Sequence, residues 1–107
     1  ALLPHVMSVN VAALRARQPE SAALRRYDEV AQLVTGDSAA TAADGVAWIQ
    51  QLCSDLQVPP LTNYGLSRSA FSELIGKAQR ASSMRGNPIE LQEDELQEVL
   101  NRACDDA

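Results

Sequence analysis

The chain has 107 residues, enough for one modest hydrophobic core, and 46% of them are hydrophobic, which argues against wholesale disorder. The formal net charge of −5 has the wrong sign for a nucleic-acid-binding protein, which needs a basic surface to contact phosphates. Only 4% of the residues are aromatic, and a core of Ala, Leu, Val and Ile favours packed helices over a β-sandwich.

The first predicted helix begins at the start of the chain. Its apolar face consists of Leu3, Val6, Met7 and Asn10, with Leu2 beside it. No capping residue or polar stretch precedes this face, so we expect the helix to be truncated, with its first turns missing. The exposed leucines should then pack on something absent from these residues, or drive self-association into a homo-oligomer.

Two further helices follow in the first half of the chain. The second is predicted over residues 19–35, with Pro19 in its first turn and Gly36 as its C-terminal cap. A capping box formed by Thr41 and Asp44 opens the third, which runs until Pro59 and Pro60 end it. The buried stripe of the third helix is predicted to be Val46, Ile49, Cys53 and Leu56, which makes Cys53 a core thiol.

The second half predicts two more helices joined by an irregular segment. Ser67 is expected to cap the fourth helix, whose inward face is Phe71, Leu74, Ile75, Ala78 and Ala81. Residues 82–91 should be irregular, and the last helix should begin near Gln92. Its first turn holds the acids Glu93, Asp94 and Glu95 as surface charge, and its buried stripe is Leu96, Val99, Leu100 and Ala103. Residues 1–107 thus predict a single all-α domain, a helical bundle of about five helices.

The residues offer no recognisable catalytic, cofactor or metal site. His5 is the only imidazole, and we interpret it as a partly buried, hydrogen-bonded residue rather than a general base. The isolated glycines form no phosphate-binding loop, and no nucleophile has an identifiable base. The basic residues Arg15, Arg17, Arg25 and Arg26 are interpreted as a solvated helix face.

The cysteines and the hydropathy of the chain predict the cellular location of the protein. Cys53 and Cys104 lie far apart in the sequence without a CxxC pair or a signal peptide, which indicates reduced thiols in a cytoplasmic protein. No apolar run approaches the length of about 20 residues that spans a bilayer, so we expect no membrane association.

Three stretches, taken in order, change the functional interpretation. They are LLPHVM at residues 2–7 followed by Asn10, VPPL at 58–61 running into YGL at 64–66, and MRGNPI at 84–89. Together they resemble the C-terminal helical region of the iron-containing (group III) alcohol dehydrogenases. RYDEVA at 26–31 is similar to that family's RYxEIA helix, and LQEDEL at 91–96 to its LTxxEL opening, with Gln92 in place of the capping Thr. The resemblance covers nearly the whole chain.

The resemblance implies that the chain is one part of a larger two-domain, NAD(P)-dependent enzyme. In that family an α/β domain binds NAD(P), and one Asp and three His of the helical domain hold Fe²⁺ or, in some members, Zn²⁺. The metal acts as a Lewis acid, and the nicotinamide carries hydride between a small alcohol and its aldehyde. His5 matches a histidine that is not a ligand, so the resemblance gives these residues neither metal ligands nor a nucleotide site, and we expect them to be inactive alone.

The resemblance also suggests a substrate-facing segment. The residues just before GNP match a family segment that approaches the substrate pocket, which makes Ser83 and Met84 candidates for lining it. An ordinary interhelix loop explains the same residues equally well.

Two other classes remain open. The helical stripes also fit a free-standing interaction module whose apolar groove takes a partner helix, although any bundle core produces such stripes. A relative of glycerol dehydrogenase or dehydroquinate synthase would share the two-domain plan, but without LLPHVM combined with this GNP segment.

Overall fold

The computed structural model describes residues 1–105, and these form five α-helices and three short 3₁₀ helices with no strand. This confirms the predicted all-α bundle. The α-helices are α1 (Leu3–Arg17), α2 (Ala22–Thr35), α3 (Ala42–Asp55), α4 (Phe71–Arg80) and α5 (Glu93–Asp105). The 3₁₀ helices are η1 (Leu61–Tyr64), η2 (Arg68–Ala70) and η3 (Ser82–Gly86).

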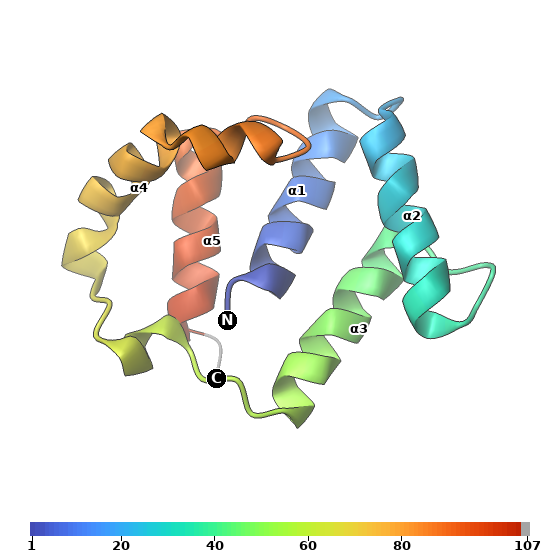
Figure 1. Ribbon diagram of the computed structural model, residues 1–107, viewed down its shortest axis with the longest axis horizontal. Coiled ribbons are helices and arrows are strands. Elements are labelled where there is room, and N and C mark those ends of the chain that lie inside the picture. Colours follow the sequence, from blue (N-terminus) through green and yellow to red (C-terminus); the bar gives the residue numbers. More distant parts are fainter. Residues whose placement is uncertain (106–107) are drawn as a thin grey trace.

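Helix α1 lies in the middle of the molecule (Figure 1). It contacts α5 on one side and both α2 and α3 on the other, while α4 covers α5 from the far side. The arrangement places α2 and α3, which pack closely and cross each other, at one end of the molecule. It also brings the segment between α4 and α5 across the C-terminal half of α1.

The main core lies between α1, α4 and α5. Its buried side chains come from α1, from α4, from the segment before α5 and from α5 itself: Val9, Ala13, Leu14, Phe71, Ile75, Ile89, Leu91, Leu96, Val99, Leu100 and Cys104. A smaller cluster of Val11, Ala42 and Val46 joins α1 to α3. Helix α1 therefore supplies both cores, one from each of two faces.

Several predicted helix boundaries are confirmed. Gly36 ends α2 in the left-handed conformation at φ 73°. The Asp44 carboxylate accepts a 2.8 Å hydrogen bond from the Thr41 backbone N–H at the start of α3. The last helix begins at Glu93, and its predicted stripe of Leu96, Val99, Leu100 and Ala103 is buried.

Two predicted helix starts were wrong. Helix α2 begins at Ala22 rather than Pro19, because the Ser21 hydroxyl accepts from the Ala23 backbone N–H and caps the helix there. Residues 68–70 form the separate 3₁₀ helix η2 before α4 begins at Phe71, and the Ser67 side chain contacts the Ser69 hydroxyl instead of capping.

Two predicted apolar faces are buried only in part. In α4, Phe71 and Ile75 are buried but Leu74 is exposed, because only one side of this short helix meets α5. In α3, Val46 is buried while Leu56 is exposed and Cys53 is half-buried, so the prediction of a core thiol at position 53 was wrong. The second half of α3 extends beyond the small core that buries its first half.

Helix α3 ends before its prolines. It stops at Asp55, and Gln57 adopts a left-handed conformation with φ 56°. The Val58 N–H donates to the Cys53 carbonyl at 3.0 Å, and the Gln57 N–H to the Ser54 carbonyl at 3.0 Å. This is the pattern of a Schellman C-cap, in which the left-handed position usually holds glycine. The segment 82–91 also has more order than predicted, since it contains η3.

Helices α2 and α3 approach closely at Gly45. A Cβ at this position would lie 2.9 Å from the Ala31 Cβ and 3.1 Å from its Cα. Ala31 itself is fully buried. The absence of a side chain at position 45 therefore sets the separation of the two helices.

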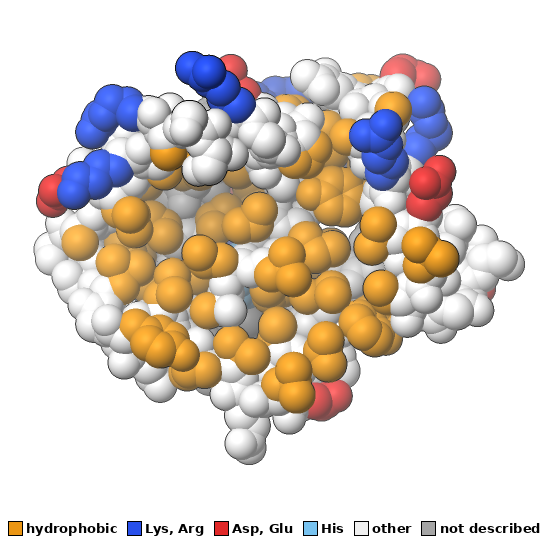
Figure 2. Space-filling model, in the orientation of Figure 1, with side chains coloured by type: hydrophobic (Ala, Val, Ile, Leu, Met, Phe, Trp, Pro, Cys, Tyr) orange, Lys and Arg blue, Asp and Glu red, His pale blue; other side chains and the backbone are white. Residues whose placement is uncertain are grey.

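Apolar side chains spread over the middle of one face of the molecule, and charged side chains lie around its rim (Figure 2). The large apolar residues with substantial exposure, over the whole surface, are Leu2, Leu3, Val30, Leu33, Trp48, Leu52, Leu56, Tyr64 and Leu74. Within residues 1–105, none of the helices combines the length and the apolar character that a membrane crossing requires.

Candidate functional site

A pair of asparagines, one buried and one half-buried, joins α1 to the segment after η3. The Asn10 Nδ2 donates to the Asn87 Oδ1 at 3.0 Å, and the Asn87 Nδ2 donates back to the Asn10 Oδ1 at 2.8 Å. Asn10 is only 2% exposed. Because two planar amides exchange two hydrogen bonds, both the distance and the orientation of the two segments are fixed.

The remaining amide hydrogens of this pair are also used. The Asn87 Nδ2 donates to the Ile89 carbonyl at 2.6 Å, which holds the turn around Pro88. The Asn10 Nδ2 donates to the Tyr27 hydroxyl of α2 at 3.1 Å. Three stretches that are distant in sequence, the first helix, the RYDEVA helix and the GNP turn, therefore meet at one polar cluster.

The neighbour of Tyr27 anchors a different helix. The Asp28 Oδ1 accepts a 2.7 Å hydrogen bond from the Ala42 backbone N–H. This N–H belongs to the first turn of α3, where no partner exists within the helix. The RYDEVA helix thus holds α1 through Tyr27 and caps α3 through Asp28.

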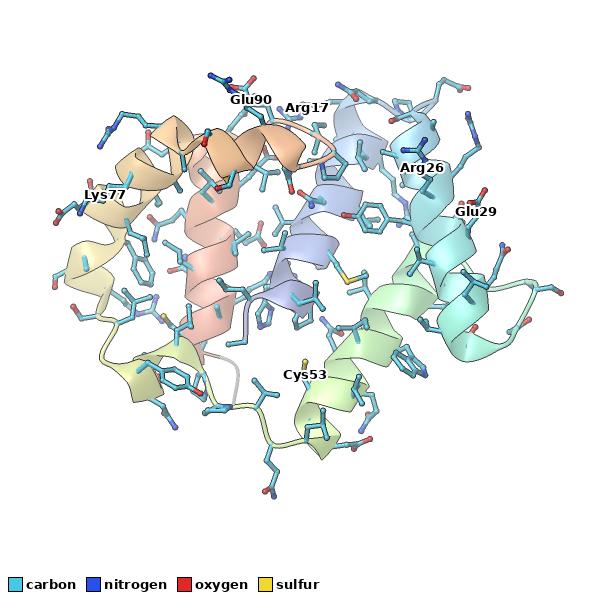
Figure 3. The ribbon with its side chains drawn as sticks, in the orientation of Figure 1. Arg17, Arg26, Glu29, Cys53, Lys77 and Glu90 are labelled. Carbon is cyan, nitrogen blue, oxygen red and sulfur yellow. The ribbon has the colours of Figure 1, made fainter. Side chains whose placement is uncertain are left out.

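The segment between α4 and α5 is fastened again near its other end. The Arg17 Nη2 donates to the Glu90 carbonyl at 3.0 Å and to the Glu95 carboxylate at 2.8 Å, and Figure 3 shows Arg17 and Glu90 together at one edge. The Glu95 carboxylate also accepts from the Gln92 N–H at 2.8 Å. Glu93 and Asp94 are exposed as predicted, whereas Glu95 is a cap and an ion-pair partner.

A hollow of about 590 Å³ lies beside η3. Met84 is half-buried, packs against the main core and lines this hollow, together with residues of α4, α5 and the segment between them: Gln79, Arg80, Ala81, Arg85, Asn87, Glu90, Leu91 and Leu96. Ser83 is exposed and does not line it. The two predicted pocket residues are adjacent in η3, but they face different surroundings, and their contact with a substrate stays a prediction.

A second hollow, of about 510 Å³, lies between the start of α1 and the end of α3. His5, which is 5% exposed and so buried more completely than predicted, lines it together with Cys53. Figure 3 shows Cys53 on the side of α3 turned toward the start of α1. Apolar and amide groups of α3 and the connector after it, among them Gln50 and Pro59, complete the wall.

The ionisable residues do not converge on a metal site. In the part of the chain that the structure describes, no group of three or more His, Cys, Asp or Glu lies close enough together to hold a metal ion. Both Cys53 and Cys104 are free thiols.

The chain was compared with known protein families, curated proteins and solved structures. The family described as "Fe-containing alcohol dehydrogenase family, C-terminal" matches residues 1–104. The chain belongs to this family. No curated protein and no solved structure matches the chain. The resemblance based on LLPHVM, on VPPL running into YGL, and on MRGNPI is thereby confirmed, since the family match spans all three stretches.

In this member of the Fe-containing alcohol dehydrogenase family, the hydrogen-bonded pair of Asn10 and Asn87 was not predicted from the sequence. Asn10 stood on an apolar helical face, and Asn87 stood in the GNP turn. A buried asparagine needs a hydrogen-bond partner, so Asn10 on such a face was a signal. The spacing of residues in the sequence did not indicate which distant polar side chain would be the hydrogen-bond partner of Asn10.

Proposed function

We propose that the chain is the helical C-terminal part of a metal-dependent, NAD(P)-linked alcohol dehydrogenase that interconverts a small alcohol and its aldehyde by hydride transfer. The family match over residues 1–104 is the observation that supports this proposal. The match gives no support to a free-standing interaction module.

In this proposal the metal and the nicotinamide are held by other parts of the parent chain. The described residues do not fit a metal site, because no three metal-ligating side chains converge among them. Residues 1–107 would instead brace the ligand-bearing region and form one wall of the substrate cleft. Ser83 and Met84 would lie on that wall, the serine offering a hydroxyl and the methionine an apolar surface.

The exposed apolar surface is consistent with burial against the rest of the parent chain. Leu2 and Leu3 at the start of α1 are 44% and 57% exposed, and they belong to the helix that supplies both cores. Apolar side chains in such number on one face (Figure 2) are typical of a surface that packs against more protein.

The test is an activity measurement on the full-length parent chain and on residues 1–107. We expect the full-length protein to reduce NAD⁺ or NADP⁺ with a short primary alcohol in the presence of Fe²⁺ or Zn²⁺, and to lose this activity on chelation. Residues 1–107 alone should show no turnover and no stoichiometric Fe²⁺ binding by calorimetry. A full-length protein that is inactive on every alcohol tested, with both nucleotides and both metals, would contradict the proposal.

A further inference from the structure

The segment that contains Ser83 and Met84 has few attachments of its own. Within η3 the backbone bonds are local, from the Met84 N–H to the Ala81 carbonyl and from the Asn87 N–H to the Met84 carbonyl, each at 3.1 Å. Ser82, Ser83 and Arg85 are exposed, while Met84 and Asn87 are half-buried. Among residues 82–87, Met84 is attached through the core and Asn87 through Asn10, while Ile89 and Leu91 enter the core after the turn.

Of these two attachments, the asparagine pair is the one that defines a position. An apolar contact such as that of Met84 tolerates sliding and rotamer changes, because it has no preferred direction. The two hydrogen bonds between the amides of Asn10 and Asn87 do not tolerate such movements. A displacement would leave donors and acceptors of Asn10, which is nearly fully buried, without partners. Asn87 lies four residues after Ser83. Because the backbone between them is short, the position of Asn87 determines the position of Ser83 and Met84.

We propose that Asn10 and Asn87 are positioning residues for substrate binding, which hold Ser83 and Met84 at a fixed place relative to α1. The inference rests on the proposed dehydrogenase function, because that function makes η3 a wall of the substrate cleft. Neither asparagine contacts the substrate. The two asparagines act through the position of η3. Their substitution should therefore change the kinetic constants for the alcohol and leave those for the nicotinamide unchanged.

The kinetic experiment uses the full-length parent chain with its metal and nicotinamide. Asn10→Ala removes one partner and Asn87→Ala the other, while Asn87→Asp keeps the size and the acceptor oxygen and loses the two donated bonds. We expect the alanine variants to lower kcat/KM for the alcohol by about 10- to 100-fold, the scale of a 1 Å misplacement. The KM for the nicotinamide should stay within about twofold of the wild-type value. The double alanine variant should be impaired by less than the sum of the two single effects, because both substitutions remove the shared exchange between Asn10 and Asn87.

Gly45→Ala is the matched control. It destabilises the molecule at the α2–α3 contact without touching the asparagine pair. If the asparagines only added stability, this variant would impair alcohol turnover as much as they do. We expect its kinetic constants for both the alcohol and the nicotinamide to stay within about twofold of wild type.

A second readout does not depend on activity. Arg85 is exposed in η3, so trypsin cleavage after Arg85 reports how firmly the segment is held. We expect cleavage at this bond to be about tenfold faster in Asn87→Ala and Asn87→Asp than in wild type or Gly45→Ala, the scale expected when one hydrogen-bonded attachment is lost.

The outcomes separate the two proposals. Unchanged cleavage after Arg85, or equal acceleration in Gly45→Ala, would show that the Asn10–Asn87 pair does not hold η3 in place. This conclusion would not depend on the activity measurements. Faster cleavage with an unchanged kcat/KM for the alcohol overturns the positioning role and leaves the dehydrogenase assignment intact. A wild-type protein with no alcohol turnover overturns the dehydrogenase assignment and the substrate role of the pair together.

Discussion

At the scale of the residue, position 57 carries a side chain in a conformation that favours glycine. Gln57 has φ 56°, and its backbone completes the C-cap of α3. A left-handed conformation costs an L-residue about 1–2 kcal/mol, and glycine avoids this cost but loses more chain entropy on folding.

We therefore expect Gln57→Gly to raise the free energy of unfolding by about 0.5–1 kcal/mol. The matched control is Gln50→Gly, the same change at an exposed position inside α3, which should lower it by a similar amount. Urea denaturation followed by circular dichroism measures both. Equal signs for the two substitutions would show that the left-handed backbone is not the cause.

A second residue-scale prediction concerns the missing side chain at position 45. Gly45→Ala would place a Cβ 2.9 Å from that of the buried Ala31, and overpacking of this kind costs about 1–3 kcal/mol. Gly76→Ala in α4 is the control, because its Cβ would meet only the end of the flexible Arg80 side chain at 3.4 Å. That variant should be stabilised by up to about 1 kcal/mol through helix propensity. Destabilisation by both substitutions would contradict the argument from close packing.

At the scale of the element, α3 depends on a cap supplied by its neighbour. Asp28 of α2 accepts from the Ala42 N–H at 2.7 Å. Asp28→Ala should lower the free energy of unfolding by about 1–2 kcal/mol, as loss of an N-cap does. Glu29→Ala removes the next acid, which points away from α3 in Figure 3 and is exposed, and should change stability by less than about 0.5 kcal/mol. Thermal unfolding measures the stability of both variants. Equal losses of stability would mean that the loss of a negative charge, and not the loss of the cap, is the cause.

The element scale also shows where prediction from sequence succeeds. Gly36, the Thr41–Asp44 box and the stripe of α5 were all predicted correctly, because each signal lies within a few residues of the structure it determines. Cys53 and Leu74 were assigned to the core incorrectly, since a helical stripe does not reveal how far the neighbouring helix extends. The start of α2 was missed for a local reason, as Ser21 competes with Pro19 and supplies a side-chain acceptor.

The candidate site was predictable only in part. Ser83 and Met84 were singled out through the family resemblance, and the structure places them in η3 beside a hollow that Met84 lines. The pairing of Asn10 with Asn87 depends on how α1 and the α4–α5 segment cross, which is a property of the assembled core. No spacing within the sequence encodes that crossing.

At the scale of the whole molecule, the exposed apolar surface should make residues 1–107 associate with themselves when produced alone. Leu2→Gln combined with Leu3→Gln should weaken this association, whereas Glu29→Gln, at an exposed position on α2, removes no apolar side chain and should leave it unchanged. Sedimentation velocity over a range of concentrations measures the effect. A wild-type chain that remains monomeric at high concentration would contradict it.

The asparagine pair also has a consequence for biosynthesis. Its two partners are 77 residues apart, so at about 5–20 residues per second the ribosome adds the second about 4–15 s after the first. Until then Tyr27 can accept only one of the bonds that Asn10 makes, and the amide oxygen of Asn10 lacks the donor that Asn87 supplies, which disfavours burying α1 early. The nascent chain should therefore hold α1 open to solvent, and to chaperones, until the residues around Asn87 have been synthesised.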